Sequence, residues 1–175
     1  MSKNLDFNQK TILITGGAGF IGSNIAIYLQ ETFPNSKIVI FDCFRNNDTF
    51  PNGNLQSYGH YQNLINFDGE IICGNINNQN DLKLLDKYNF DFIFHQAAIS
   101  DTRVYDQEII MKTNANAFND ILKLSLRNSA ALVYASSAAT YGSMPSPQTI
   151  GEEKPENPYG FSKLIMDHMA KRHIQ

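Results

Sequence analysis

The chain has 175 residues, of which 42% are hydrophobic and 18% are charged, and its formal net charge is −3 at pH 7. These values predict one globular domain and exclude a disordered or polybasic nucleic-acid-binding protein, and no apolar run approaches the roughly 20 residues of a membrane span. The polar opening 1–10 lacks the apolar core of a secretory signal, and the two cysteines and four histidines lack paired-ligand spacing, so we expect a cytoplasmic protein with free thiols and no metal site.

Short apolar runs alternate along the chain with segments of helical periodicity. Strands are expected at 11–15, 37–42, 70–73, 90–95 and 131–136, and helices at 21–33, 80–88, 107–128 and 158–173. Asn157 and Pro158 are residue types preferred at the start of a helix. Strands whose apolar residues run on without alternation are usually covered by helices on both faces. The pattern therefore predicts an α/β fold with a doubly wound parallel sheet of the Rossmann type.

The segment 44–67 interrupts this alternation. It is rich in Asn, Gly, Ser and Tyr, has no period and is long for a connection inside a compact domain. We expect a functional or mobile surface excursion there. No strand is expected after the helix 158–173, whereas a doubly wound fold normally adds strands for a second half. We therefore expect residues 1–175 to form one NAD(P)-binding domain of a longer protein whose C-terminal substrate domain lies outside this chain.

A glycine-rich phrase, TGGAGFIG at 15–22, follows the first apolar run and opens the first expected helix. Gly16 suits a tight turn, Gly19 lets the backbone approach a pyrophosphate, and Gly22 lets the helix pack closely on its strand. The N-terminus of the helix would then face the phosphate charge. A glycine pattern in this strand-to-helix context predicts a dinucleotide site.

Tyr159 and Lys163 are four residues apart on the last expected helix, so their side chains project from one face. A phenol has a pKa of about 10, and a neighbouring ammonium lowers this pKa by stabilising the phenolate. Ser137, at the end of the fifth expected strand, could hydrogen-bond the same substrate oxygen. Such a pair in isolation more often consists of a packing ring and a solvated ammonium. Together with the glycine turn and Ser137, it predicts a general base for a hydroxyl proton.

Asp42 and Arg45 give opposite indications about the cofactor. Asp42 ends the second expected strand about 20 residues after the glycine turn, where a carboxylate bonds the ribose 2′-hydroxyl of NAD. Arg45 could meet the 2′-phosphate of NADP, although a solvated loop charge is almost as good an interpretation. These two residues leave both cofactors open.

Four phrases of the sequence together resemble the extended short-chain dehydrogenase/reductase family, over residues 10–172. They are the phrases at 15–24, 95–102, 134–142 and 157–163. The first and last mark the superfamily, and the middle two are most similar to nucleotide-sugar epimerases that act on ADP-heptose. Dehydratases of this family usually carry Thr-Asp-Glu where this chain has Ser-Ala-Ala at 137–139, which disfavours elimination chemistry.

The resemblance implies an NADP-dependent isomerase, tolerant of NAD, that inverts C6 of ADP-D-glycero-D-manno-heptose for the inner core of lipopolysaccharide. The sugar carbinol is oxidised by hydride transfer, and the hydride then returns to the opposite face. In this scheme Tyr159 takes the hydroxyl proton, Lys163 lowers the tyrosine pKa and bonds the nicotinamide ribose, and Ser137 orients the oxygen.

The opposite-face base would be a lysine beyond residue 175. We therefore expect the chain alone to be inactive, and the longer protein to be a homo-oligomer without nucleic-acid or membrane partners. The alternatives are another nucleotide-sugar epimerase, such as a UDP-hexose 4-epimerase, and a non-catalytic nucleotide-binding module.

We expect the residues after the fourth expected strand to pack closely beneath the cofactor, where the small side chains of Ala97 and Ala98 permit the approach of its pyrophosphate and ribose. The segment 100–102, Ser100, Asp101 and Thr102, lies at the mouth of the expected cleft and could contact the sugar. By resemblance Asn114 would reach toward the cofactor, with an exposed amide as an equally good interpretation. The expected cofactor residues are Gly16, Gly19, Phe20, Ile21, Gly22, Asp42, Cys43, Arg45, Asn75, Ile76, His95, Gln96, Ala97, Ala98, Asn114, Tyr159 and Lys163.

Overall fold

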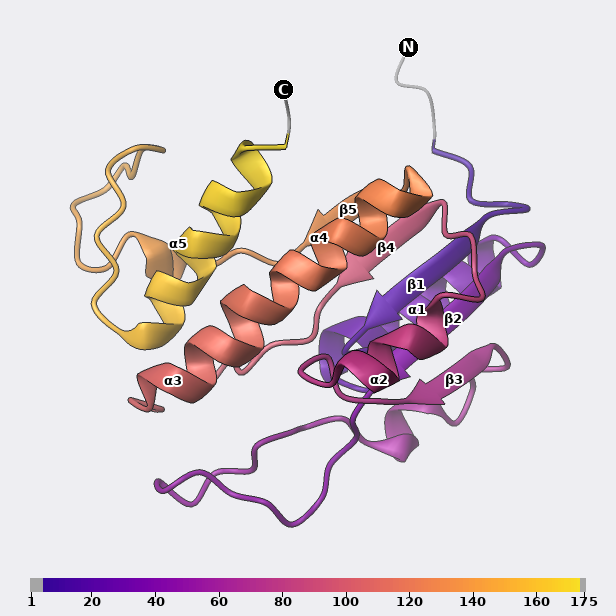
Figure 1. Cartoon of the computed structure of the whole chain (residues 1–175), viewed down its shortest axis with the longest axis horizontal. Coiled ribbons are helices and arrows are strands. Elements are labelled where there is room, and N and C mark those ends of the chain that lie inside the picture. The colour runs from indigo at the N-terminus through magenta and orange to yellow at the C-terminus, as the bar shows by residue number, and fades with distance from the viewer. Residues whose placement is uncertain (1–4, 174–175) are drawn as a thin grey trace.

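The computed structural model describes residues 5–173. Residues 1–4 and 174–175 lie outside the described residues. The first of these ranges belongs to the polar segment 1–10, which we expect not to be a secretory signal. Five parallel strands form one sheet in the order β3-β2-β1-β4-β5 (Figure 1). The strands are β1 (Thr11–Thr15), β2 (Lys37–Asp42), β3 (Glu70–Cys73), β4 (Phe92–His95) and β5 (Ala131–Tyr134). The strand order reverses between β1 and β4, which confirms the doubly wound α/β fold.

The helices alternate with the strands as the periodicity predicts. They are α1 (Phe20–Thr32), the short 3₁₀ helix η1 (Tyr61–Leu64), α2 (Gln79–Leu82) with its 3₁₀ continuation η2 (Lys83–Leu85), α3 (Gln107–Ile110), the π-helical η3 (Met111–Asn116), α4 (Ala117–Asn128), the 3₁₀ helix η4 (Ala138–Thr140) and α5 (Pro158–Lys171). Since α3, η3 and α4 follow one another directly, the expected helix 107–128 is present with a π-helical segment inside it. Among residues 5–173 there is no helix of the length and hydropathy needed to cross a membrane.

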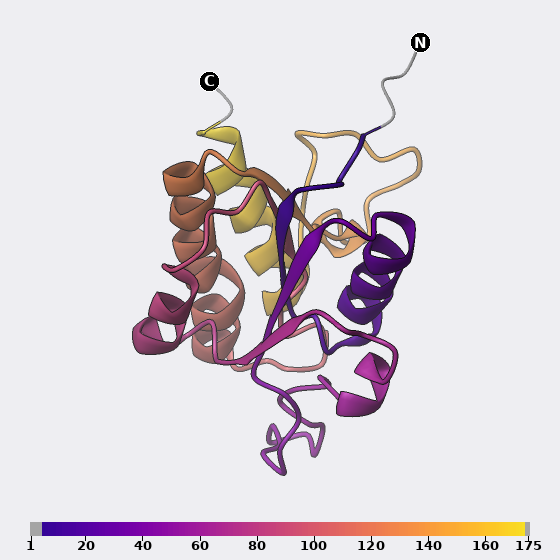
Figure 2. The ribbon, with the colours of Figure 1, turned by 90° about the vertical axis from the view of Figure 1, so that its right-hand side faces the viewer.

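The two faces of the sheet carry separate apolar clusters, as is typical of buried parallel strands. Leu13 and Val39 point to one face, where they pack with residues of η2 and α4. Ile14 and Ile40 point to the other face, where they pack with residues of α1 and η1. Figure 2 shows α1 on one side of the sheet and α4 and α5 on the other. On the α1 side β5 is left uncovered, and Val133 is 48% exposed.

Two strands are shorter than the sequence predicts, for different reasons. The N–H of Phe90 donates to Asn128 Oδ1 (2.9 Å) instead of joining the ladder, and β4 begins at Phe92. The last residue of β5, Tyr134, pairs with His95, which is the last residue of β4. The expected continuation of β5 to residue 136 is wrong because no partner strand remains beyond this pair.

The segment 44–67 divides into a loop, 44–60, which we call the excursion, and η1 with its flanks. The excursion is organised by its own backbone: Thr49 and Leu55 form an antiparallel bridge, and Gln56 N donates to Asp48 O (3.0 Å). In Figure 1 the excursion lies below the carboxyl ends of the strands and extends toward α3. It therefore occupies the edge where ligands of doubly wound sheets bind.

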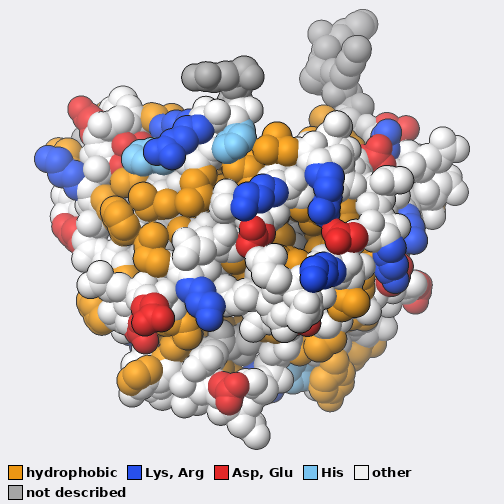
Figure 3. Space-filling model, in the orientation of Figure 1, with side chains coloured by type: hydrophobic (Ala, Val, Ile, Leu, Met, Phe, Trp, Pro, Cys, Tyr) orange, Lys and Arg blue, Asp and Glu red, His pale blue; other side chains and the backbone are white. Residues whose placement is uncertain are grey.

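The face that carries α2 and α4 mixes basic and acidic side chains (Figure 3). Arg127 pairs with Asp86 (2.5 Å), and Lys123 pairs with Asp120 (3.4 Å). Exposed pairs of this kind add little stability, because water and salt screen them. On this face, the positive charges of Arg127 and Lys123 are therefore each offset by a neighbouring carboxylate.

Candidate cofactor and catalytic site

The glycine-rich turn between β1 and α1, residues 15–22, forms a cradle pressed against neighbouring backbone. Gly16 has φ +68°, and a Cβ there would lie 2.6 Å from the amide nitrogen of Ala97. A Cβ on Gly22 would lie 2.3 Å from the carbonyl oxygen of Gly16. Because real Cβ atoms do not approach backbone this closely, glycine alone fits both positions. The structure also places Gln96 and Ala97 directly against the turn, because their backbone atoms lie within 3 Å of a Cβ built on Gly16.

The N-terminus of α1 is open toward the outside of the cradle. Gly19 caps the helix without a side-chain hydrogen bond, and the first turn has no acidic residue. A Cβ on Gly19 would meet only the Gly16 carbonyl oxygen, at 3.2 Å. Phe20 and Ile21, which begin the helix, are 80% and 58% exposed. Free N–H groups and the positive end of the helix dipole suit a pyrophosphate, so the cradle fits a dinucleotide.

Asp42 is 6% exposed, and both of its carboxylate oxygens accept backbone hydrogen bonds. Oδ2 accepts from Ala18 N (3.0 Å), and Oδ1 accepts from Phe44 N (2.7 Å). Gly59 lies against the same group, since a Cβ there would be 2.2 Å from Oδ1. Burial raises the pKa of Asp42, and the two backbone hydrogen bonds oppose this shift. Asp42 therefore ties the cradle to the excursion and keeps less capacity for a ribose hydroxyl than its sequence position suggests.

Cys43 and Arg45 follow Asp42 at the carboxyl end of β2, and both are exposed. Cys43 Sγ lies 3.5 Å from Ser57 Oγ in the excursion. The backbone N–H of Arg45 bonds the Gly59 carbonyl (2.7 Å), which fixes the backbone at the root of its side chain. The Arg45 guanidinium takes part in no ion pair with a residue of 5–173. Its charge is therefore available to a ligand at this edge.

Asn75 and Ile76 follow β3 and differ in role. The N–H of Asn75 donates to Asp81 Oδ2 (2.9 Å), and its own Oδ1 accepts from Asn77 N (2.9 Å), so its side chain organises the turn before α2. Ile76 is 7% exposed and packs in the core cluster that contains Leu13. The structure thus uses Ile76 mainly as a core residue, which its place directly after a strand did not reveal.

His95 is buried beneath the cradle. Its Nδ1 lies 2.7 Å from Thr15 Oγ1, while among the described residues its Nε2 has no hydrogen-bond partner. Burial lowers the pKa of His95 to about 3, and the Lys163 charge adds to the effect. The imidazole is therefore neutral at physiological pH and leaves an orphaned polar atom inside the site.

Tyr159 and Lys163 lie on the first turns of α5, which begins where predicted because the Asn157 side chain caps it. Lys163 is 3% exposed. Its Nζ donates to the Ala135 carbonyl (2.9 Å) and lies 5.8 Å from the centre of the Tyr159 ring. Burial lowers the pKa of Lys163 to about 8. A buried ammonium beside a phenol is arranged to stabilise the phenolate.

Ser137 lies beyond the end of β5 instead of at it. It caps the short helix η4, and its hydroxyl accepts a hydrogen bond from Ala139 N (3.1 Å). The start of α5 packs closely on this segment, since a Cβ on Gly160 would lie 2.4 Å from the Ala139 carbonyl oxygen. The structure thereby brings the Ser137 segment against the helical turn that carries Tyr159.

Asn114 is fully buried, so its interpretation as an exposed amide is wrong. Its Oδ1 accepts from Ile99 N (2.8 Å), and its Nδ2 donates to Ile99 O (3.0 Å) and to Ser162 Oγ (3.0 Å). It lies in η3, where the π-helical segment interrupts regular helix geometry, a feature often found at functional positions. Asn114 therefore joins the loop after β4 to the helix that carries Tyr159 and Lys163.

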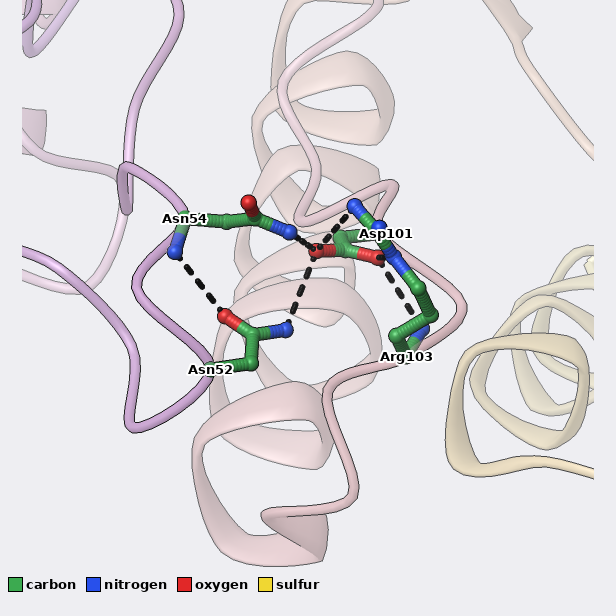
Figure 4. A network of polar contacts seen from close by, with 4 residues as sticks. All are labelled: Asn52, Asn54, Asp101 and Arg103. Atoms are coloured by element: carbon green, nitrogen blue, oxygen red, sulfur yellow. Dashed lines mark hydrogen bonds and ion pairs between the residues drawn. The ribbon is translucent and has the colours of Figure 1, made fainter.

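The segment 100–102 lies in the loop between β4 and α3, and its first and last residues are exposed. Asp101 is already engaged within the protein (Figure 4). Its Oδ1 accepts from Arg103 N and Nε (both 3.0 Å), and its Oδ2 accepts from the side-chain amides of Asn52 (3.2 Å) and Asn54. A sugar contact by this carboxylate would have to compete with these bonds.

Several contacts of the candidate site that the sequence did not reveal connect segments far apart in the chain. Thr15 Oγ1 meets His95, and the amides of Asn52 and Asn54 reach Asp101. Thr15 is a polar residue at the end of an otherwise apolar strand, and this pattern could have indicated its hydrogen bond. The Asn pair carried no local signal, because its partner is 49 and 47 residues away.

The sequence of the chain matches a known protein family over nearly its whole length. The match covers residues 12–175 and is to the NAD dependent epimerase/dehydratase family. Among solved structures, the chain is similar to ADP-L-glycero-D-manno-heptose-6-epimerase from Helicobacter pylori, with 48% sequence identity and a TM-score of 0.89. That similarity covers 97% of this chain and 53% of the other.

Two further epimerases of known structure are also similar. UDP-glucose 4-epimerase from Brucella ovis, in complex with NAD, is 30% identical, with 94% of this chain and 47% of that chain covered and a TM-score of 0.75. UDP-N-acetylglucosamine 4-epimerase from Methanobrevibacter ruminantium M1, in complex with UDP-N-acetylmuramic acid, is 26% identical, with 94% and 50% covered and a TM-score of 0.77. The chain spans about half the length of these proteins. The resemblance to extended short-chain dehydrogenases/reductases is confirmed, and the chain belongs to the NAD dependent epimerase/dehydratase family.

Proposed function

We propose that this chain is the dinucleotide-binding part of a nucleotide-sugar epimerase that uses NADP. The observation that carries the proposal is the buried Lys163 ammonium, 5.8 Å from the Tyr159 ring, beyond the same edge of the sheet as the glycine cradle. A cradle alone suits any dinucleotide-binding protein, whereas a phenol beside an ammonium suits chemistry on a hydroxyl. The similarity to three epimerases supports the same reaction class.

In the proposed reaction, bound NADP would accept a hydride from the sugar carbinol and return it. Tyr159 would take the hydroxyl proton on its phenolic oxygen, and Lys163 would favour the phenolate through its charge. With a pKa of about 8, Lys163 is still mostly charged at pH 7. Ser137 would hold the substrate oxygen by a hydrogen bond. We assign the opposite-face acid/base and most sugar contacts to the other half of a longer, homo-oligomeric cytoplasmic protein.

The substrate we propose is ADP-D-glycero-D-manno-heptose, inverted at C6 for the inner core of lipopolysaccharide. The 48% identity with the Helicobacter pylori enzyme over 97% of this chain supports it. The Ser-Ala-Ala phrase at 137–139 argues against a dehydratase, because it lacks carboxylates that could act as acid and base in an elimination.

The preference for NADP rests on the carboxyl end of β2. Both oxygens of Asp42 accept backbone hydrogen bonds, and the exposed Arg45 guanidinium, which makes no ion pair within residues 5–173, could meet a 2′-phosphate. We expect Arg45→Ala to weaken NADPH binding about tenfold and to leave NADH binding unchanged, as for the loss of one charged hydrogen bond. Equal loss for both nucleotides in a fluorescence titration would remove the basis for NADP.

Turnover of the native gene product tests the reaction itself. The product is incubated with ADP-D-glycero-D-manno-heptose and, separately, with UDP-glucose, and C6 or C4 inversion is followed by NMR. We expect inversion of the heptose alone, and Tyr159→Phe should abolish it while NADPH still binds, because only the acid/base oxygen is removed. Turnover of UDP-glucose alone would favour a UDP-hexose 4-epimerase, and undiminished turnover by Tyr159→Phe would refute the role of the phenol.

A further inference from the structure

Two loops that are distant in the sequence meet at the carboxylate of Asp101 (Figure 4). The excursion supplies the side-chain amides of Asn52 and Asn54, both bonded to Oδ2. The loop between β4 and α3 supplies Arg103, whose N and Nε both donate to Oδ1 at 3.0 Å. Oδ2 also accepts from Arg103 Nη2 (3.5 Å), so the one carboxylate bonds both loops and joins them.

An apolar contact beside Asp101 joins the same two loops. Phe50, in the excursion, is 4% exposed and packs against Ile99, Val104 and Ile110 from the loop after β4 and from α3. Asn52 and Asn54 follow Phe50 in a tight turn, in which Asn54 N donates to Asn52 Oδ1 (3.0 Å). The polar and apolar contacts therefore act on the same tip of the excursion.

The position of the excursion relates it to the cradle. It leaves β2 next to Asp42, and at its far end His60 N donates to the carbonyl of Ala18 inside the cradle (2.9 Å). Its tip is held by the loop after β4. The excursion thus runs from the cradle to the end of β4, along the edge where β1 and β4 mark the reversal of strand order and where ligands bind in this fold.

The loop that holds the tip is itself fixed to the catalytic helix. Asn114 bonds both backbone groups of Ile99, two residues before Asp101, and donates to Ser162 Oγ in α5. Ser162 lies between Tyr159 and Lys163 in the sequence. Asp101 therefore fastens the excursion to a rigid part of the site.

We propose that Asp101 is a positioning residue, whose carboxylate holds the excursion across the mouth of the dinucleotide crevice and slows the release of bound nucleotide. This inference rests on the proposed function, because it requires a dinucleotide in the cradle. It departs from the expectation that Asp101 contacts the sugar. Its basis is the geometry of the two loops, which leaves neither oxygen of Asp101 without a partner.

The charge of Asp101 strengthens this contact. Hydrogen bonds from Arg103, and then from Asn54, hold the pKa of Asp101 well below its usual range. The group is therefore ionised throughout the physiological pH range. Bonds from amides and a guanidinium to an ionised carboxylate are about twice as strong as neutral ones. An amide in place of the carboxylate removes this charge without changing the size of the side chain.

Release of NADPH from the intact chain tests the proposal. Bound NADPH is chased with excess NADP⁺, and its fluorescence is followed by stopped flow in the wild type, Asp101→Asn and Asn54→Ala. We expect both variants to release NADPH about tenfold faster, as for one lost charged hydrogen bond, with little change in association rate. Hydrogen exchange of the Phe50 and Gln56 amides without nucleotide should accelerate in parallel.

A matched control and an exchange variant separate fastening from general damage. Asn46→Ala is the control, because among residues 5–173 the Asn46 side chain bonds only Asp48, which also lies in the excursion, and release should match the wild type. The double exchange N54D/D101N restores an amide–carboxylate pair with the two partners reversed and should slow release again. Asn54→Asp alone places two carboxylates together and should release faster than Asn54→Ala.

The outcomes distinguish the two proposals. If the wild type shows no saturable NADPH fluorescence, the proposed function falls and this inference falls with it. Suppose instead that the wild type binds NADPH and that amide exchange shows the excursion loosened in Asp101→Asn and Asn54→Ala. If NADPH then leaves these variants at the wild-type rate, only the positioning role is overturned. If Asp101→Asn does not fold, Asn54→Ala decides by the same criterion, because it leaves the Arg103 bonds to Asp101 in place.

Discussion

The cradle and the excursion are neighbouring loops at one edge of the sheet, but they are held by different means. In the cradle, a Cβ on Gly22 would lie 2.3 Å from backbone, so the turn is shaped by contact between main chains. In the excursion, Gly53 has φ +82° and nothing within 4 Å of a built Cβ. Its own backbone bridge shapes it, and side chains, namely Phe50 and the amides on Asp101, fasten it to the next loop. At Gly22 the cradle therefore has no room for a side chain, whereas we expect the excursion to detach without unfolding the sheet.

The largest expected effect is that of Gly22→Ala in the cradle. The obstructing atoms belong to the Gly16 and Gly17 backbone, which cannot rotate away, so we expect a loss of about 4 kcal/mol in the free energy of unfolding, at the upper end for single substitutions. NADPH binding should be lost as well. Urea unfolding and a fluorescence titration measure both quantities. An ordinary substitution costs about 1 kcal/mol. If Gly22→Ala lowered the free energy of unfolding by no more than that, the cradle would have room to relax.

Phe50→Ala should act on the excursion and not on the sheet. Truncating a buried Phe costs about 3 kcal/mol, but here the loss falls on one contact between loops. Residues 46–57 should therefore exchange their amide hydrogens fast while the amides of β1 and β4 keep their protection. Exchange monitored by NMR gives both regions at once. Equal acceleration in the strands would show that the excursion is part of the cooperative core.

Lowering the pH should destabilise the fold through His95, which lies under the cradle, and should leave the contacts of the excursion intact. Because burial lowers its pKa to about 3, the unfolded chain binds a proton below pH 6.5 that the folded chain does not, and stability falls as the pH drops. Between pH 7 and pH 5 this one group should cost about 2 kcal/mol, and His95→Asn should lack that share of the decline.

The control for the His95 experiment is the excursion itself. The depressed pKa of Asp101 keeps its contacts intact at pH 5, so amide protection of the excursion relative to the core should not weaken there. A His95→Asn variant that declines as steeply as the wild type would show that the imidazole is not the acid-sensitive group.

Gly53→Ala should have the smallest effect. The position is spatially open, so only the left-handed backbone conformation opposes a side chain, at a cost of about 1 kcal/mol that reduced freedom of the unfolded chain partly offsets. Thermal unfolding measures the difference from Gly22→Ala directly. If the two substitutions were equally damaging, the contrast between a packed and an open loop would be wrong.

The sequence predicted the parts of this protein that depend on local pattern. The alternation of strands and helices, the glycine turn and the Asn157 cap follow from apolar periodicity and from residue types that suit one backbone geometry. The pairing of Tyr159 with Lys163 follows from helical spacing. Each of these features is decided by residues within one or two turns of one another.

What the sequence could not predict depends on contacts across the fold. The sequence did not show that Ile76 packs in the core, because burial after a strand depends on which helix covers it. β5 ends early because β4 ends, which is a property of the partner strand. The engagement of Asp101 by Asn52 and Asn54 joins loops whose proximity exists only once the sheet has formed.

The assignment of the cradle as a dinucleotide site is tested most directly by a fluorescence titration of this chain with NADPH, with Gly22→Ala as the control. We expect saturable binding to one site in the wild type, weaker binding of NADH and no binding by Gly22→Ala. Absence of saturable binding of either nucleotide by the folded wild-type chain would contradict the assignment of the cradle, and with it the proposed function.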